Sequence, residues 1–178
     1  MTMQSPEVQA LSSLYLFKQT PPDALQELLD ASRVLTFQTG DRIFGVGEPS
    51  DTALLVITGR LIVVLPEGDG EYRLGDVRPG EITGETALLT NDGRRGASLC
   101  VQEDATCLEL TQELLMVIAD SPAVIALEQH LMGTMARRIR EINTNIQKAT
   151  RITAGSEDSE ETGVTVLLGR LRTFFRGA

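Results

Sequence analysis

Residues 80–89 of this chain read GEITGETALL, and after a short loop residues 95–98 read RGAS. The first segment places a glycine and a glutamate before residues 86–89, for which we expect one turn of helix. The unpaired N–H groups at the start of a helical turn attract an anion. Arg95 can donate two parallel hydrogen bonds to one phosphate, which the point charge of a lysine cannot match. Together the two segments predict a phosphate cradle.

Glu85 is the unexpected member of this group, because a carboxylate beside a phosphate repels it. It fits the group if it accepts a hydrogen bond from a sugar hydroxyl while an arginine balances its charge. The spacing of Glu85 and Arg95 therefore favours a ribose phosphate over a bare phosphate. The alternative is a helical turn capped by Glu85, with Arg95 as an ordinary surface charge.

The flanking sequence alternates short β-rich runs with glycine, aspartate and proline turns. The glycines recur about every 8 to 12 residues, which is typical of a small antiparallel sandwich or barrel. The predicted strands cover residues 34–37, 42–44, 53–58, 60–65, 72–77, 97–102 and 106–110. We therefore expect a mainly β domain over residues 34–122, with the phosphate cradle (80–98) inside it.

Helical patterns precede and follow this domain. Residues 1–33 predict an N-terminal helical segment that two adjacent prolines interrupt. Residues 123–150 predict one long helix, because apolar residues recur at steps of three or four. They are Val124, Leu127, Leu131, Met135, Ile139, Ile142 and Ile146. Residues 151–163 predict an acidic linker, and residues 164–178 a short basic amphipathic tail.

The composition argues against several classes of protein. The net charge of the 178 residues is −9, whereas duplex-DNA binders present a basic face. Cys100, Cys107 and His130 are too few for a zinc or iron–sulfur site, and we expect two free core cysteines rather than a disulfide. The chain shows no nucleophile motif and no metal-ligand cluster, so we expect no enzyme.

The sequence also bears on cellular location. It contains neither a secretory signal pattern nor an apolar run of about 20 residues, the length that crosses a bilayer. We therefore expect a cytoplasmic protein without a transmembrane segment.

The phosphate cradle resembles the phosphate-binding cassette of the cyclic nucleotide-binding domain family. That family has a pattern close to Phe-Gly-Glu-x-Ala-Leu, a loop and Arg-x-Ala; here residues 83–88 read TGETAL and residues 95–97 read RGA. Segments 40–48 and 55–59 are similar to the glycine-marked strand pairs of the family. The resemblance implies an α+β, mainly β fold: an antiparallel double-stranded β-roll, like a jelly roll, with N-terminal helices and a long C-terminal helix.

The resemblance also implies roles for individual residues. Glu85 would hold the ribose 2′-hydroxyl and Arg95 the cyclic phosphate. The ligand-binding set is Gly84, Glu85, Thr86, Ala87, Arg95, Gly96 and Ala97, with Arg138, Ile142 and Asn143 as lid or base contacts and no metal. Thr83 departs from the family's bulky residue at this position. Gly96 lacks the hydroxyl that favours guanine, so cAMP is the expected ligand, ahead of cGMP, and no other cofactor is implied.

By the same resemblance, the protein would be a bacterial-type cyclic-nucleotide sensor. Ligand binding would move the helix over residues 123–150 and control a partner protein through that helix or the tail. The apolar stripe of the helix favours a homodimer over packing on its own roll. We expect no direct DNA binding, since only 28 residues follow Thr150. The alternative function is a structural dimerisation or scaffold module with a degenerate or empty pocket.

The tail over residues 164–178 leaves three interpretations open. A short helix with apolar and basic residues can dock on a partner protein or lie on an anionic membrane. It can also pack loosely on its own domain.

Overall fold

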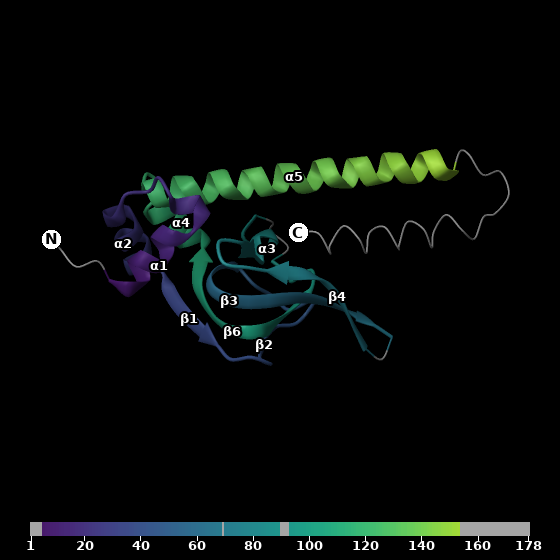
Figure 1. The fold of residues 1–178 in the computed structure, drawn as a ribbon, viewed down its shortest axis with the longest axis horizontal. Helices are drawn as coiled ribbons and strands as arrows, with labels where there is room; N and C mark the ends of the chain where they lie inside the picture. The colour runs from purple at the N-terminus through teal and green to yellow at the C-terminus, as the bar shows by residue number, and fades with distance from the viewer. Residues whose placement is uncertain (1–4, 69, 90–92, 154–178) are drawn as a thin grey trace. The chain divides into compact units, whose positions relative to one another are not determined.

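A computed structural model describes residues 5–68, 70–89 and 93–153 (Figure 1). The chain divides into two compact units, residues 1–131 and residues 132–178. The helices are α1 (Pro6–Ser13), the short 3-10 helix η1 (Tyr15–Phe17), α2 (Pro22–Ala31), α3 (Glu85–Leu89), α4 (Gln112–Val117) and α5 (Pro122–Thr153).

The strands of the first unit form an antiparallel β-roll. They are β1 (Arg33–Phe37), β2 (Arg42–Phe44), β3 (Thr52–Glu67), β4 (Gly70–Val77), β5 (Ile82–Thr83) and β6 (Ser98–Thr111). Strand β6 pairs with β1, β2 and β3, and β3 also pairs with β4 and β5. The predicted fold class, mainly antiparallel β with helices before and after it, is confirmed.

Two pairs of predicted strands are continuous, so the prediction of a break in each was wrong. Residues 53–58 and 60–65 belong to the single strand β3, and the last two predicted strands belong to β6. Gly59 has a φ of 84°, and a side chain there would collide with the backbone of Asp104 on β6. The register shifts on both sides of Gly59. This glycine therefore forms a bulge inside a strand and not a turn between strands.

Side chains of β3 alternate between two apolar clusters, as the period of a strand requires. Leu55 packs with residues of α1, α2 and the start of α5, which lie side by side in Figure 1. Its neighbours Leu54 and Val56 pack in the second cluster, between the strands. The residues of the second cluster are Leu54, Val56, Leu61, Val77, Leu99, Val101, Ala105 and Cys107. Both faces of β3 are thus buried, which fixes its register.

Helix α5 exceeds its predicted bounds of 123–150 at both ends. It begins at Pro122 and ends at Thr153, so residues 151–153 are helical and the linker predicted to begin at 151 was placed too early. The rest of that linker and the tail (164–178) lie outside the described residues. Within the described ranges, no helix is long and apolar enough to span a bilayer. Cys100 and Cys107 are free, as expected.

Candidate ligand-binding site

The predicted phosphate cradle is held against the first half of β3. Strand β5 pairs with β3, which places Ile82 opposite Leu55 and Thr83 opposite Leu54. Gly84 follows with a φ of 76°, and α3 begins at the next residue. At the far end of α3, the Gln112 side chain donates a hydrogen bond of 2.5 Å to the carbonyl of Leu88. Helix α3 is therefore held at its start by the pairing of β5 and at its end by Gln112, and it lies beside β3 in Figure 1.

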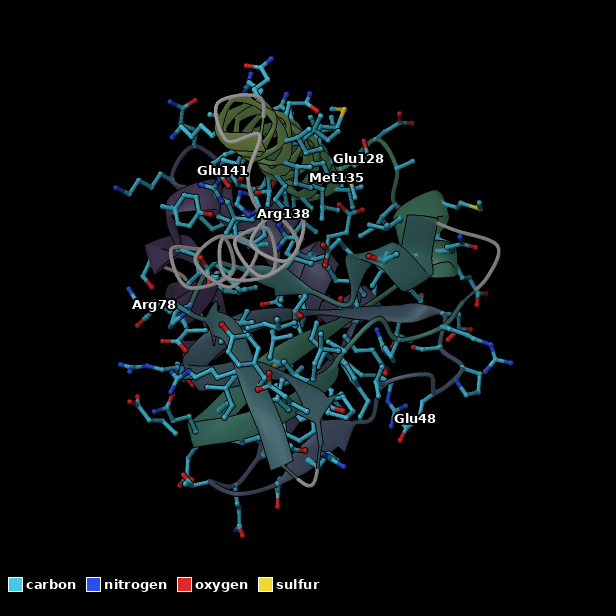
Figure 2. The ribbon with its side chains drawn as sticks, turned by 90° about the vertical axis from the view of Figure 1, so that its right-hand side faces the viewer. Glu48, Arg78, Glu128, Met135, Arg138 and Glu141 are labelled. Carbon is cyan, nitrogen blue, oxygen red and sulfur yellow. The ribbon has the colours of Figure 1, made fainter. Side chains whose placement is uncertain are left out.

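The backbone of Arg95 is paired with the loop between β2 and β3. Its N–H donates to the carbonyl of Glu48 at 2.9 Å, and its carbonyl accepts from the N–H of Gly47 at 2.7 Å. Glu48 marks this loop in Figure 2. The neighbouring Arg94 is exposed, and its guanidinium donates to the carbonyl of Gly47. Two adjacent arginines thus have opposite surroundings.

The guanidinium of Arg95 is bound along one edge. Nη1 donates to the carbonyls of Thr52 (2.7 Å) and Gly84 (3.2 Å), and Nη2 donates to the hydroxyl of Thr52 at 3.1 Å. The ring of Phe44 covers one face, with its centroid 4.0 Å from Cζ. Nε is buried and has no hydrogen-bond partner within the part of the chain that the structure describes. A strong donor beside the cassette therefore lacks an acceptor.

Gly84 makes this arrangement possible. A side chain at this position would collide with Nη1 of Arg95, and the positive φ disfavours other residues as well. The absence of a side chain at Gly84 therefore allows the guanidinium to lie against the backbone of the cassette.

Glu85 and Arg95 are the only buried charged residues in the described ranges, each 7% exposed. Burial lowers the pKa of Arg95, while the carboxylates of Asp51, Glu48 and Glu85 oppose this shift by favouring its charged form. Burying a charge is costly unless it is paired and hydrogen-bonded. Two buried charges and a buried donor without an acceptor therefore mark this place as a site and not as ordinary core.

The other predicted site residues differ in their surroundings. Thr86 and Gly96 are exposed and Ala97 is half-buried, while Ala87 lies within α3. Arg138, Ile142 and Asn143 lie in the second unit, on the part of α5 where Figure 2 labels Arg138. Their approach to the ligand stays a prediction.

Sequence reasoning missed Thr52 and Phe44, the two residues whose side chains contact the Arg95 guanidinium. Thr52 is 43 positions before Arg95 in the chain. Neither residue carries a local signal for binding, since threonine and phenylalanine are common strand residues. Phe44 lies in segment 40–48, whose similarity to a glycine-marked strand pair of the family was the one signal in the sequence that pointed to this region.

Comparison with known proteins identifies the same segment. The family model of the cyclic nucleotide-binding domain matches residues 34–121. The chain is 26% identical over 133 residues to a CRP-like cAMP-activated global transcriptional regulator of Mycobacterium tuberculosis, covering 74% of this chain and 58% of that protein. It is 30% identical over 105 residues to human cGMP-dependent protein kinase 2, covering 58% of this chain and 14% of the kinase.

The fold has a matching solved structure. The crystal structure of the catabolite activator protein of Thermus thermophilus superposes with a TM-score of 0.64 at 26% identity, covering 76% of this chain and 62% of the other. The chain spans less than two thirds of the length of this protein and of the mycobacterial regulator.

Proposed function

Because residues 34–121 belong to the cyclic nucleotide-binding domain family, we propose that this protein is a regulatory sensor that binds a cyclic nucleotide through Glu85 and Arg95. One observation carries the proposal: these two residues are the buried charges of the described chain, and Nε of Arg95 has no partner there. A bound phosphodiester supplies the acceptors that this donor lacks.

Each proposed role follows from the chemistry of the side chain. Arg95 donates two hydrogen bonds to the two free oxygens of the cyclic phosphate. Glu85 accepts a hydrogen bond from the ribose hydroxyl, which compensates for the burial of its charge. The remaining contacts are backbone N–H groups near Thr86, Ala87 and Ala97, and Gly84 and Gly96 keep the site free of side chains.

We propose cAMP as the ligand. The mycobacterial relative is described as cAMP-activated and the human relative as cGMP-dependent, so the relatives alone allow either. Gly96 has no hydroxyl to bond a guanine base, which favours adenine. Arg138, Ile142 and Asn143 are the proposed lid and base contacts.

The proposed output is mechanical and not enzymatic. A ligand shifts a helix only through different affinity for its two positions, and such coupling amounts to about 1 to 3 kcal/mol. We propose that α5 of a cytoplasmic homodimer moves in this way. It would then control a partner protein through α5 or the tail, without direct contact to DNA.

Isothermal titration with cAMP and cGMP tests the proposal. Arg95→Lys keeps the positive charge and loses the two parallel N–H donors of the guanidinium. We expect it to weaken binding about 100-fold, the equivalent of one or two charge-assisted hydrogen bonds. Glu85→Gln should weaken it about tenfold by the same reasoning. Arg94→Lys, the exposed neighbour, is the matched control and should keep the wild-type affinity.

Two results would contradict the proposal. The first is equal weakening by Arg94→Lys and Arg95→Lys. The second is the absence of heat with any cyclic nucleotide, which would support the alternative function, a scaffold with an empty pocket.

A further inference from the structure

We infer that Thr52 and Phe44 are positioning residues, which decide which edge of the Arg95 guanidinium faces the ligand. This inference rests on the proposed function and deepens it. The two side chains come from β3 and β2, outside the cassette, and both touch the guanidinium directly.

The hydrogen bonds of Arg95 leave the donors of one edge without an acceptor among the described residues. A guanidinium has five N–H donors in a fixed plane. Three are used: both on Nη1, for the carbonyls of Thr52 and Gly84, and one on Nη2, for the hydroxyl of Thr52. The two that remain are the N–H of Nε and the second N–H of Nη2, which point the same way along one edge. Two parallel donors match two oxygens of one phosphodiester.

Thr52 is suited to hold this orientation because it is itself held in place. It begins β3 and lies opposite Thr111 of β6. Its N–H donates to the Ser50 hydroxyl at 3.3 Å, and the two hydroxyls are 3.4 Å apart. Since its carbonyl and its hydroxyl both accept from Arg95, this one residue binds the whole end of the guanidinium.

Phe44 covers one face of the guanidinium plane. Its ring lies over the guanidinium plane, which prevents tilting toward that face and stabilises a positive charge that burial disfavours. Phe44 pairs with Leu99 of β6, so the ring is attached to the sheet and not to a free loop. With the end and one face covered, the edge containing Nε is the one that remains for a ligand.

Titration with cAMP across four variants tests this assignment. Thr52→Val keeps the shape and removes the acceptor, and we expect about tenfold weaker binding, the equivalent of one lost hydrogen bond to a charged group. Thr52→Ser returns the hydroxyl and should recover most of that affinity. Phe44→Leu should weaken binding about fivefold, and Phe44→Tyr, which keeps a ring, should recover it. Thr58→Val, at an exposed position of the same strand, is the matched control.

A double-mutant cycle separates positioning from general stability. In an Arg95→Lys background there is no guanidinium edge to orient, so adding Thr52→Val should change the affinity less than about twofold. An equal tenfold loss in both backgrounds would overturn the inference. If Thr52→Val fails to fold, the same cycle with Phe44→Leu decides.

The proposed function and this inference fail in different ways. No binding by the wild-type protein refutes the proposed function and the inference together. Binding by the wild type that Thr52→Val and Phe44→Leu leave unchanged overturns the inference alone.

Discussion

Helix α5 contains two regions with one sequence pattern and opposite surroundings. In its first turns, Ala123, Val124 and Leu127 are fully buried in the core of the first unit. Beyond Leu131, the same apolar stripe continues into the second unit, where Ile139 is 58% and Ile142 39% exposed. The apolar residues recur at helical spacing in both regions.

The difference shows what an apolar stripe does and does not specify. Burying a leucine or isoleucine side chain contributes about 1.5 to 3 kcal/mol, so an apolar face at helical spacing favours a covered state. In the first turns the cover is the β-roll with α1 and α2. In the continuation, Ile139 is an exposed apolar residue of the second unit, which supports the proposed homodimer. Four predictions test this contrast, in order of decreasing effect.

Cysteine reactivity should show the largest difference, between the roll that covers the first turns of α5 and the continuation of the helix. Burial raises the pKa of Cys107, within the roll, to about 12 from an ordinary 9.0. At pH 8 this lowers its reactive thiolate fraction about a thousandfold. In a Cys100→Ser protein that also carries Ile139→Cys, the new thiol should react with a chromogenic disulfide about a thousand times faster than Cys107. Equal rates would show that the roll opens readily.

The same shift gives the folded protein a pH dependence. Because the pKa of Cys107 is raised in the folded state, its contribution to stability is complete below pH 9.0 and is lost as the pH rises toward 12.

The next largest difference should be in the loss of stability when a side chain of the stripe is shortened to alanine. Leu127→Ala removes a fully buried side chain, so we expect the free energy of unfolding to fall by about 2 to 5 kcal/mol. Ile139→Ala should change it by less than about 0.5 kcal/mol in dilute protein, where a dimer dissociates. Urea titration measures both variants. Similar losses would mean that the continuation is also covered within one chain.

A charge in the continuation tests the proposed dimer. Ile139→Glu would bury an unpaired carboxylate between two copies, so we expect the dimer to dissociate about 100-fold more readily. Analytical ultracentrifugation over a range of concentrations measures this. Arg140→Glu, an exposed position on the same helix, controls for the change in charge. A wild-type protein that sediments only as a monomer would contradict the prediction.

The smallest expected effect is an increase in the free energy of unfolding. Gly133 lies on α5 with no atom within 4 Å of an added Cβ, so Gly133→Ala should stabilise the helix by about 0.4 to 1 kcal/mol. Gly84→Ala is the matched variant in the roll. There the new side chain meets Arg95 at a positive φ, so stability and nucleotide affinity should both fall. Thermal unfolding of both proteins checks the two signs.

The cassette could be recognised because its residues are close together in the sequence. Glu85, α3 and Arg95 lie within residues 85–95, and each of the two charged residue types has a distinct proposed role toward a ribose phosphate. The prediction of a break within β3 failed because the feature that decides it is not local in sequence. Gly59 looks the same in a turn and in a bulge, since both use a positive φ, and only the pairing with β6 distinguishes them.

By itself, the sequence determined the α+β class, the cassette motif and the apolar period of α5, because each depends on residues that are close along the chain. The tertiary structure decided which part of the α5 stripe is buried. It also decided that Thr52 and Phe44 hold the Arg95 guanidinium so that its Nε lacks an acceptor in the described chain. Burial and orientation depend on residues that are distant in sequence, which no local pattern encodes.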